Sequence, residues 1–161
     1  MRRLISLFLL VAIAFGEQLF VVSSGPQELE AKILEKLFTD MVRSERVMVF
    51  ILGEKREYYK KNLKRYAERI VIVSSCEKAE IVFVAGELGE LPEDCRKKTL
   101  FSTKREHLFR WYNCVGAFYW KKGRPNLLLI EERLRDMNIE LPRDYRKFIE
   151  PQKRVGAVGR T

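Results

Sequence analysis

The stretch Val115–Ile130, VGAFYWKKGRPNLLLI, places the strongest constraint on the fold of this chain. It contains two apolar runs, Val115–Trp120 and Asn126–Ile130, on either side of the charged segment Lys121–Arg124. That segment includes Gly123, which can adopt positive φ without steric strain, and such a turn between apolar runs predicts a β-hairpin. Because neither run alternates with polar residues, we expect both faces of the hairpin to be covered and the hairpin to lie inside the fold.

The rest of the chain alternates short apolar runs with longer amphipathic stretches. The runs that predict buried strands are Leu19–Ser24, Val47–Leu52, Ile70–Val73, Ala79–Ala85 and Thr99–Ser102. The stretches that predict helices are Pro26–Val42, Glu54–Glu68, Glu106–Tyr112, Glu131–Met137 and Pro142–Glu150. Strands and helices that alternate in this way predict right-handed βαβ units and a parallel sheet. We therefore expect an α/β fold, a three-layer Rossmann- or flavodoxin-like sandwich, with a mostly parallel sheet and the C-terminal β-hairpin as an antiparallel pair or edge.

The N-terminal segment has the pattern of a Sec-type signal peptide. The basic pair Arg2–Arg3 precedes a 12-residue apolar run, Leu4–Phe15, and small residues stand at the cleavage position. Twelve residues span only about 18 Å as a helix, against a bilayer core of about 30 Å, which favours cleavage after Gly16 over a retained membrane anchor. The expected division of the chain is a signal peptide over residues 1–16, a single α/β domain over 17–150 and a flexible tail over 151–161.

Basic residues exceed acidic ones, since 31 Lys and Arg against 22 Asp and Glu give a formal net charge of +9. The predicted helix over Tyr58–Tyr66 interleaves aromatic and basic side chains, as some nucleic-acid-binding surfaces do. An exported protein seldom meets nucleic acid, so we interpret this face as solvated and expect no nucleic-acid partner. Attraction to an anionic membrane surface or to an acidic partner is the alternative. Charged residues make up 33% of the chain, which is typical of thermophiles.

Small and hydroxylic residues stand at the predicted carboxyl ends of several strands, where open α/β sheets bind ligands. These candidate binding residues are Ser24, Gly25, Gly53, Ser102, Thr103 and Lys104. A helix N-terminus follows several of them, which suits an anionic or hydroxylated small ligand, and ordinary caps and turns are the alternative. The hairpin turn adds Lys122 and Arg124, because no requirement of the core explains its positive charges and Arg suits bidentate contact with carboxylate or phosphate. A solvated turn without a partner is the alternative there.

The sequence gives little support to an enzyme. It contains neither GxGxxG nor GxxxxGK[ST], so we expect no nucleotide cofactor, and no other motif implies one. His107 is the only histidine and stands among charged residues, which favours a position on the surface of a helix over a role as catalytic base. No metal-ligand cluster and no Ser/His/Asp order stands out. We therefore predict no catalytic residue and no metal site.

The cysteines bear on the expected compartment, because an exported chain meets oxidising conditions in which disulfides form. Cys114 stands at the entry to the buried hairpin strand and is interpreted as a core residue. Cys76 and Cys95 stand in polar loop segments on either side of a predicted strand, and the loop after that strand must return across the sheet, which brings Cys95 toward Cys76. We predict a Cys76–Cys95 bridge. Three free thiols are the alternative, which a cytoplasmic location would favour.

The hairpin also contains a family signature. The motif G-A-F-Y-W-x-K-G-R-P-N over Gly116–Asn126, followed by an apolar strand, an E-R-L helix and an L-P turn, resembles a family of small exported bacterial proteins. Members have a secretion signal, one α/β domain and this C-terminal signature, and the resemblance covers Gln18–Glu150. Over Val115–Leu141 the chain is similar, more loosely, to YfiR-like periplasmic regulators, which restrain membrane-bound diguanylate cyclases. Those regulators also end in a strand, a K/D-G-R turn, a strand and an R-x-x-L helix.

The resemblance implies a non-enzymatic periplasmic binding or regulatory module. Such a module would control a membrane sensor, for example a diguanylate cyclase, through protein contact, with an anionic small ligand as a second partner. The alternative is a small solute-binding component of a transporter, although a typical binding protein closes a cleft between two lobes and this chain predicts only one. An enzyme is the third interpretation, and a homodimer is compatible with each of them.

Overall fold

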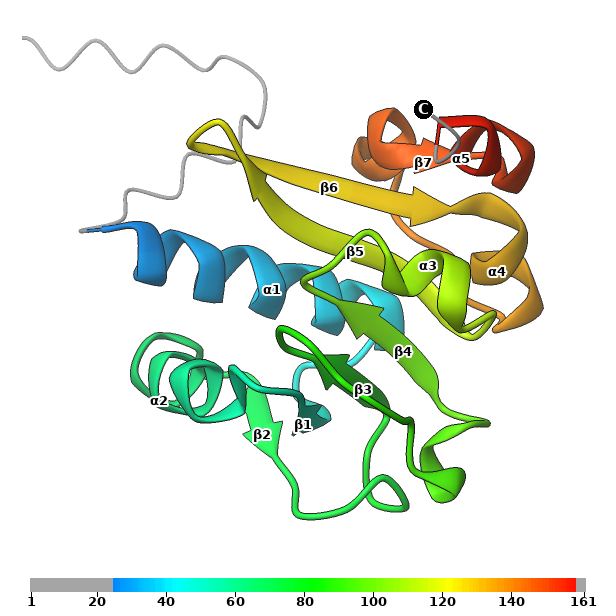
Figure 1. The fold of residues 1–161 in the computed structure, drawn as a ribbon. Coiled ribbons are helices and arrows are strands. Elements are labelled where there is room, and N and C mark those ends of the chain that lie inside the picture. The colour runs from blue at the N-terminus through cyan, green and yellow to red at the C-terminus, as the bar shows by residue number, and fades with distance from the viewer. Residues whose placement is uncertain (1–24, 159–161) are drawn as a thin grey trace, which may run out of the picture.

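Seven strands form one sheet in the computed structural model, which describes residues 25–158 (Figure 1). The strands are β1 Val47–Leu52, β2 Ile70–Ile72, β3 Ile81–Val84, β4 Thr99–Ser102, β5 Cys114–Lys121, β6 Arg124–Ile130 and β7 Ile149–Glu150. Their order is β2-β1-β3-β4-β5-β6-β7, and all neighbours are parallel except the β5–β6 hairpin. This is the flavodoxin-like order extended by two strands, and it confirms the predicted fold class. The predicted signal peptide, the predicted strand Leu19–Ser24 and the candidate residue Ser24 lie outside the described residues.

Helices cover both faces of the sheet, which produces the three layers. One face is covered by α1 Pro26–Val42 and α2 Arg56–Tyr66. The other face is covered by the 3₁₀ turn η1 Glu93–Cys95, α3 His107–Arg110 and α5 Gln152–Val158. After β6 come α4 Glu131–Asp136 and the 3₁₀ helix η2 Arg143–Phe148. Within the part of the chain that the structure describes, no helix has both the length and the apolar character needed to cross a membrane.

The core forms two clusters, because side chains along each strand point alternately to the two faces. The residues of β1 that face the α1–α2 layer are Val47, Val49 and Ile51, all fully buried. In the same cluster Phe38 of α1 packs edge-on against Phe83 of β3 and Phe101 of β4, with ring centroids 5.6 and 5.4 Å apart. Each such aromatic pair adds about 0.5–1.5 kcal/mol beyond the burial of its area. These contacts fix α1 across the middle of the sheet.

The predicted β5–β6 hairpin is present, with Gly116 opposite Leu129, but its turn is shorter than the predicted segment because Lys121 pairs with Arg124. Lys122 and Gly123 make a two-residue turn with φ of 50° and 71°, and a turn with two positive φ values matches the twist of the strands it joins. The half of the hairpin near Gly116 is buried, whereas the half near the turn is exposed. The prediction that the hairpin is covered on both faces is therefore right for its inner half and wrong for its outer half.

The predicted Cys76–Cys95 bridge is present, with the two Cα atoms 5.2 Å apart. It joins the β2–β3 connection to η1 in the β3–β4 connection, and both cysteines are fully buried in the second core cluster. Cys114 is free and buried at the start of β5, also as predicted. The two connections contain little regular secondary structure, and the bridge holds them together on this face of the sheet.

The C-terminal segment differs from the prediction at two places. Pro142–Glu150, predicted as one helix, forms η2 and then β7, which pairs in parallel with Leu129–Ile130 of β6. Tyr145 anchors η2 to α1 by donating its hydroxyl hydrogen to Asp40 at 2.6 Å. Residues 152–158, predicted as part of the flexible tail, form α5, whose Val155 is buried in the second core cluster. Both differences depend on contacts between residues far apart in the sequence, which local periodicity does not reveal.

Candidate functional site

The predicted binding residues gather at one edge of the sheet, which we call the carboxyl edge. β1, β3 and β4 are parallel neighbours and end there, and the β5–β6 turn projects from the same edge because β5 is parallel to β4. The start of α1 is also there, since the Trp120 side chain of β5 lies close enough to Glu30 to lower the pKa of its carboxyl. The described candidates at this edge are Gly25, Gly53, Ser102, Thr103, Lys104, Lys122 and Arg124.

The turns after β1 and β3 are packed directly against each other. Gly53 has φ of 101°, and a Cβ at this position would lie 2.2 Å from the carbonyl oxygen of Ala85. The Lys55 N–H donates to the Ala85 carbonyl at 3.0 Å, and the Glu54 N–H donates to the Glu87 carbonyl at 3.0 Å. Strand order reverses between β1 and β3, and this is the point where flavodoxin-like sheets hold their ligand. Here the backbone of the β3 turn fills that crevice, so Gly53 serves close packing.

The hydroxyl groups at the end of β4 are also bound to the protein itself. Ser102 is fully buried; its hydroxyl oxygen accepts the Lys104 N–H at 3.0 Å and lies 3.2 Å from the Val84 carbonyl oxygen. Thr103 Oγ1 accepts the Gly86 N–H at 2.8 Å. Both side chains therefore stabilise the turns of the carboxyl edge, which corresponds to the structural alternative considered for these residues.

His107 is buried, and the expectation of a surface position is wrong. Its exposed fraction is 2%, its Nδ1 lies 2.6 Å from the Ser102 hydroxyl oxygen, and its ring packs on Trp111 with centroids 4.6 Å apart. Burial lowers the pKa of His107 below its ordinary value, so the ring is neutral near pH 7. Among the described residues, its Nε2 has no hydrogen-bond partner. Glu106 and Arg110 are exposed at the ends of the short helix α3, whereas His107 and Leu108 are buried, and Leu108 belongs to the second core cluster.

The Ser102–His107 pair lacks the features of an activated nucleophile. Ser102 is fully buried, and no carboxylate of the described residues orients the other ring nitrogen of His107. A nucleophile needs both access to substrate and a base held in place by a third group. The pair instead connects the end of β4 to α3 through a side-chain hydrogen bond.

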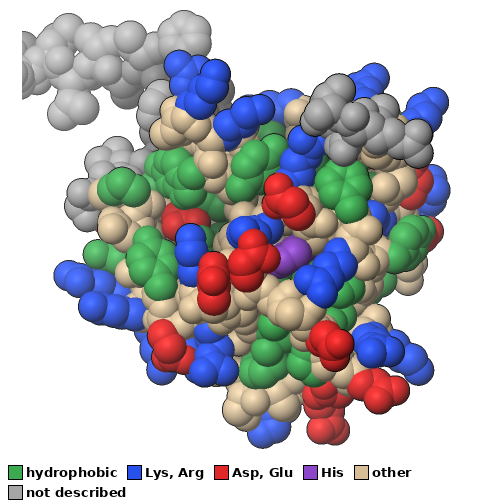
Figure 2. All heavy atoms as spheres, in the orientation of Figure 1, with side chains coloured by type: hydrophobic (Ala, Val, Ile, Leu, Met, Phe, Trp, Pro, Cys, Tyr) green, Lys and Arg blue, Asp and Glu red, His purple; other side chains and the backbone are tan. Residues whose placement is uncertain are grey.

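The exposed rim of the carboxyl edge consists of charged side chains of both signs. Lys104 forms an ion pair with Glu87, and this pairing raises the pKa of Lys104 and lowers that of Glu87. Arg110 donates to the carbonyl oxygen of Leu88 at 2.8 Å and to that of Gly89. Figure 2 shows acidic and basic side chains side by side around the small visible part of the histidine. The charged groups Lys104, Glu87 and Arg110 of the rim are therefore engaged within the protein itself.

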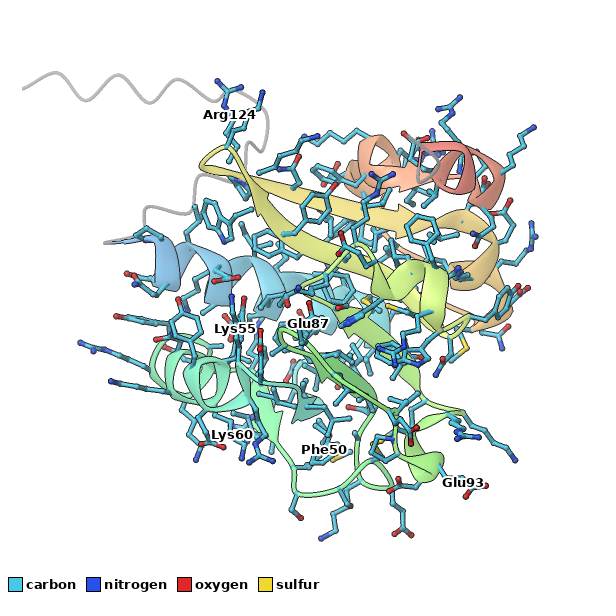
Figure 3. All side chains as sticks on the ribbon, in the orientation of Figure 1. Phe50, Lys55, Lys60, Glu87, Glu93 and Arg124 are labelled. Atoms are coloured by element: carbon cyan, nitrogen blue, oxygen red, sulfur yellow. A yellow bond between two sulfur atoms is a disulfide. The ribbon has the colours of Figure 1, made fainter. Side chains whose placement is uncertain are left out.

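The tip of the hairpin differs from this rim because its cations are unpaired. Among the described residues, the Lys122 and Arg124 side chains have no hydrogen-bond or ion-pair partner, and both are exposed. Since Ser102 is paired with Ala117 and β5 continues for four more residues, the tip projects about 13 Å beyond the end of β4. Trp120, just before the turn, is 40% exposed. Figure 3 shows Arg124 at the tip, directed away from the sheet.

A buried carboxyl group on α1, that of Glu30, is not among the residues predicted from the sequence. Glu30 is only 6% exposed, accepts the Tyr59 hydroxyl hydrogen at 2.6 Å, and has a pKa raised by its burial. Its spacing of four residues from Leu34 and eight from Phe38 places it on the apolar face of α1, and this spacing was the available signal. Glu30 ties together α1, α2 and the outer half of β5.

One group of potential metal ligands occurs among the described residues, formed by Cys76, Asp94 and Cys95 within 4.8 Å of one another. Both sulfur atoms belong to the disulfide, so neither is available as a thiolate ligand. This group therefore does not fit a metal ion.

No model of a known protein family and no curated protein matches the chain. Among solved structures it is similar to the crystal structure of a conserved domain protein from Vibrio cholerae O1 biovar El Tor strain N16961, with 7% sequence identity and a TM-score of 0.50. The match covers 78% of this chain and 60% of that chain, so this chain spans three fifths of the length of its structural neighbour. At this identity the likeness concerns the fold alone, and it agrees with the α/β sandwich described above.

Proposed function

We propose that this protein is a non-enzymatic periplasmic module that regulates a membrane sensor, such as a diguanylate cyclase, through direct contact. The observation that carries this proposal is the hairpin tip, where exposed cations and an aromatic side chain project from a rigid edge whose crevice is filled. The similarity of Val115–Leu141 to periplasmic regulators of these enzymes names the kind of partner.

The geometry of the carboxyl edge favours protein contact over capture of a small solute there. The β3 turn occupies the crevice where a solute would bind, and the hydroxyls of Ser102 and Thr103 are bound to backbone groups. A transporter component would close two lobes around its solute, whereas residues 25–158 form one sheet with its covering helices. A partner protein can recognise such closely packed turns without reorganisation of this edge.

The hairpin tip has the residue types that dominate protein interfaces. Trp and Arg are enriched among the residues that contribute most binding energy, and Arg forms bidentate contacts with carboxylates. Trp120 precedes the turn and Arg124 follows it. We therefore propose that Trp120, Lys122 and Arg124 meet an acidic surface on the periplasmic domain of the sensor.

A periplasmic location is the second part of the proposal. The buried Cys76–Cys95 disulfide is consistent with an oxidising compartment, and the N-terminal pattern predicts a cleaved signal peptide. N-terminal sequencing of protein recovered from the periplasm should give a start near Glu17. Recovery of an intact Met1 in a soluble cytoplasmic pool would contradict this location.

Photo-crosslinking tests the contact directly. A photoreactive amino acid at position 122 of the full chain, expressed in cells of the source bacterium, should crosslink to an inner-membrane protein that has a diguanylate cyclase domain. The same amino acid at position 96, on an exposed loop beside η1, is the matched control and should give no such product.

The regulatory effect is tested by cyclic di-GMP measurements in a strain that lacks the gene. The parent chain and the control variant Arg96→Ala should restore the wild-type level, whereas Arg124→Ala should fail although it accumulates normally and keeps the parent's melting temperature. Equal restoration by Arg124→Ala would exclude the tip as the contact. An unchanged cyclic di-GMP level in the deletion strain would exclude a diguanylate cyclase as the target.

A further inference from the structure

The opposite edge of the sheet, which we call the amino edge, contains an open cavity of about 650 Å³. β6 is antiparallel to β5, so it ends at the amino edge, and the cavity lies among α4, the turn 138–142, η2 and β7. Its apolar wall is formed by Leu134, Ile139, Leu141, Pro142 and Ile149. The proposed contact surface at the hairpin tip is on the other edge, so the two sites are independent.

Three guanidinium groups line this cavity without a partner. Among the described residues, Arg135, Arg143 and Arg146 have neither a hydrogen bond nor an ion pair, and all three are exposed. Two nearby arginines differ in this respect, because Arg43 binds Glu140 and Arg154 binds Glu150 at 2.8 Å. The partners that a surface arginine commonly finds are therefore missing on this wall.

The carboxylates of the cavity do not compensate these charges. Two line it, Glu131 and Glu140, and the charge of a third, Glu132 outside the lining, acts on Arg135 alone among the three arginines. Glu140 is already engaged by Arg43, and Glu131 is in the first turn of α4, where a negative charge suits the helix dipole. The cavity therefore presents a net positive, partly apolar surface.

The size and lining of the cavity define the class of ligand. Cavities that bind small molecules measure about 300–1,000 Å³ and combine apolar walls with a few polar groups that orient the ligand. Guanidinium groups bind carboxylate and phosphate in a bidentate manner, and adjacent apolar walls reduce screening by water. An aliphatic body against Leu134, Ile139 and Ile149 would place an anionic head group among the arginines.

We propose that this cavity binds a soluble organic anion with a carboxylate or phosphate head and an aliphatic body. The concave lining of the cavity favours a single small molecule over the surface of a bilayer, although a phospholipid offers the same chemistry. This site needs neither the sensor nor the hairpin tip, and its ligand is the small-molecule partner that the carboxyl edge does not accommodate.

Calorimetric titration of the full chain with hexanoate, octanoate, decanoate and octyl phosphate tests the proposal. Binding should be saturable with one site, should strengthen by roughly threefold to fourfold for each added methylene, and should weaken with added salt. The double variant Arg143→Gln/Arg146→Gln should bind at least tenfold more weakly. The control Arg96→Gln removes one exposed arginine away from the cavity and should stay within twofold of the parent.

A vesicle experiment distinguishes a soluble organic anion from a phospholipid, since both combine an anionic head group with an aliphatic body. Phosphatidylglycerol vesicles should compete with octanoate no better than phosphatidylcholine vesicles do. Flotation with phosphatidylglycerol vesicles in the absence of any binding to octanoate or octyl phosphate would overturn the proposal, as would equal binding of these probes by the parent and the double variant. Since each variant changes only exposed side chains, an unchanged melting temperature will show that loss of binding is not loss of fold.

Discussion

At the scale of single residues, the buried histidine makes stability depend on pH. The pKa of folded His107 is lower than its ordinary 6.5 because the ring is buried, so the unfolded chain binds a proton at higher pH than the folded chain does. Stability is therefore lost as pH falls through about 6.5. The charged groups that act on the ring are Glu87, Lys104, Glu106 and Arg110, and their effects partly cancel.

We predict that His107→Gln reduces this acid sensitivity. Glutamine does not titrate and can keep a polar contact with the hydroxyl of Ser102. Urea unfolding at about pH 7.5 and about pH 5.5 should show a smaller loss of unfolding free energy for the variant than for the parent. The carboxylates titrate in both proteins, so the difference between the two isolates the histidine. Identical pH dependence would mean that His107 titrates alike in the folded and unfolded chains.

A buried arginine, Arg133, is a second residue whose structural role could not be inferred from its neighbours in sequence. Arg133 of α4 is 4% exposed and donates to the carbonyl oxygens of Leu108, Trp111 and Cys114 at 2.5, 3.1 and 2.7 Å. It thereby closes the connection between α3 and β5. We predict that Arg133→Met lowers the unfolding free energy by about 3 kcal/mol, because these buried carbonyls lose their donors. The neighbouring change Arg135→Met, on an exposed side chain, should alter it by less than about 0.5 kcal/mol.

At the scale of elements, two turn glycines should respond differently to alanine. At Gly123 an added Cβ meets nothing within 4 Å, but φ is 71°, so Gly123→Ala should cost only the strain of about 1 kcal/mol. At Gly53 the strain at φ 101° is combined with a clash against the Ala85 carbonyl, so Gly53→Ala should cost at least about 3 kcal/mol. Urea unfolding measures both, and Gly89→Ala, which has neither penalty, is the control. Equal costs at the two positions would show that the turns after β1 and β3 are not packed as described.

The elements that the sequence predicts well are those whose signal is local. Apolar runs locate β1 and β4 with the bounds that the structure gives, and the Gly-containing turn locates the hairpin. By contrast, β7 exists only because Ile149–Glu150 reach the end of β6, and α5 exists because Val155 finds space in the core. Such elements depend on tertiary contacts, which override weak local preferences.

The candidate site also has features that the sequence predicts and features that depend on tertiary contacts. The rule that parallel strands end at one edge brings Gly53, Ser102 and Lys104 together, and the structure places them so. The sequence does not show that the β3 turn fills the crevice, because this depends on how closely two loops approach. The buried Glu30 could have been found from its spacing along α1, whereas the burial of His107 could not be inferred from a single helical turn among charged residues.

At the scale of the whole molecule, the thiols report whether the second core cluster forms as described, because all three cysteines belong to it. Cys114 is buried and its pKa is raised to about 12, so it should not react with thiol reagents in the folded protein. In denaturant without reductant, one thiol per chain should react, because the other two cysteines form the bridge. Three reactive thiols would exclude the disulfide.

Reduction should lower the unfolding free energy by about 3 kcal/mol, since the bridge closes a loop with a sequence separation of 19 residues. Urea unfolding with and without reductant measures this. A Cys76→Ala/Cys95→Ala variant should lose a similar amount and become insensitive to reductant. An unchanged midpoint on reduction would show that the two loops are held by their packing alone.

The position at which α1 begins has a consequence for how the molecule can be tethered. Because Trp120 lies close enough to Glu30 to lower the pKa of its carboxyl, the described chain starts near the hairpin, on the same edge as the proposed contact surface. A fusion partner or purification tag attached ahead of α1 would therefore obstruct the proposed contact surface, whereas a tag attached after α5 would leave that surface accessible.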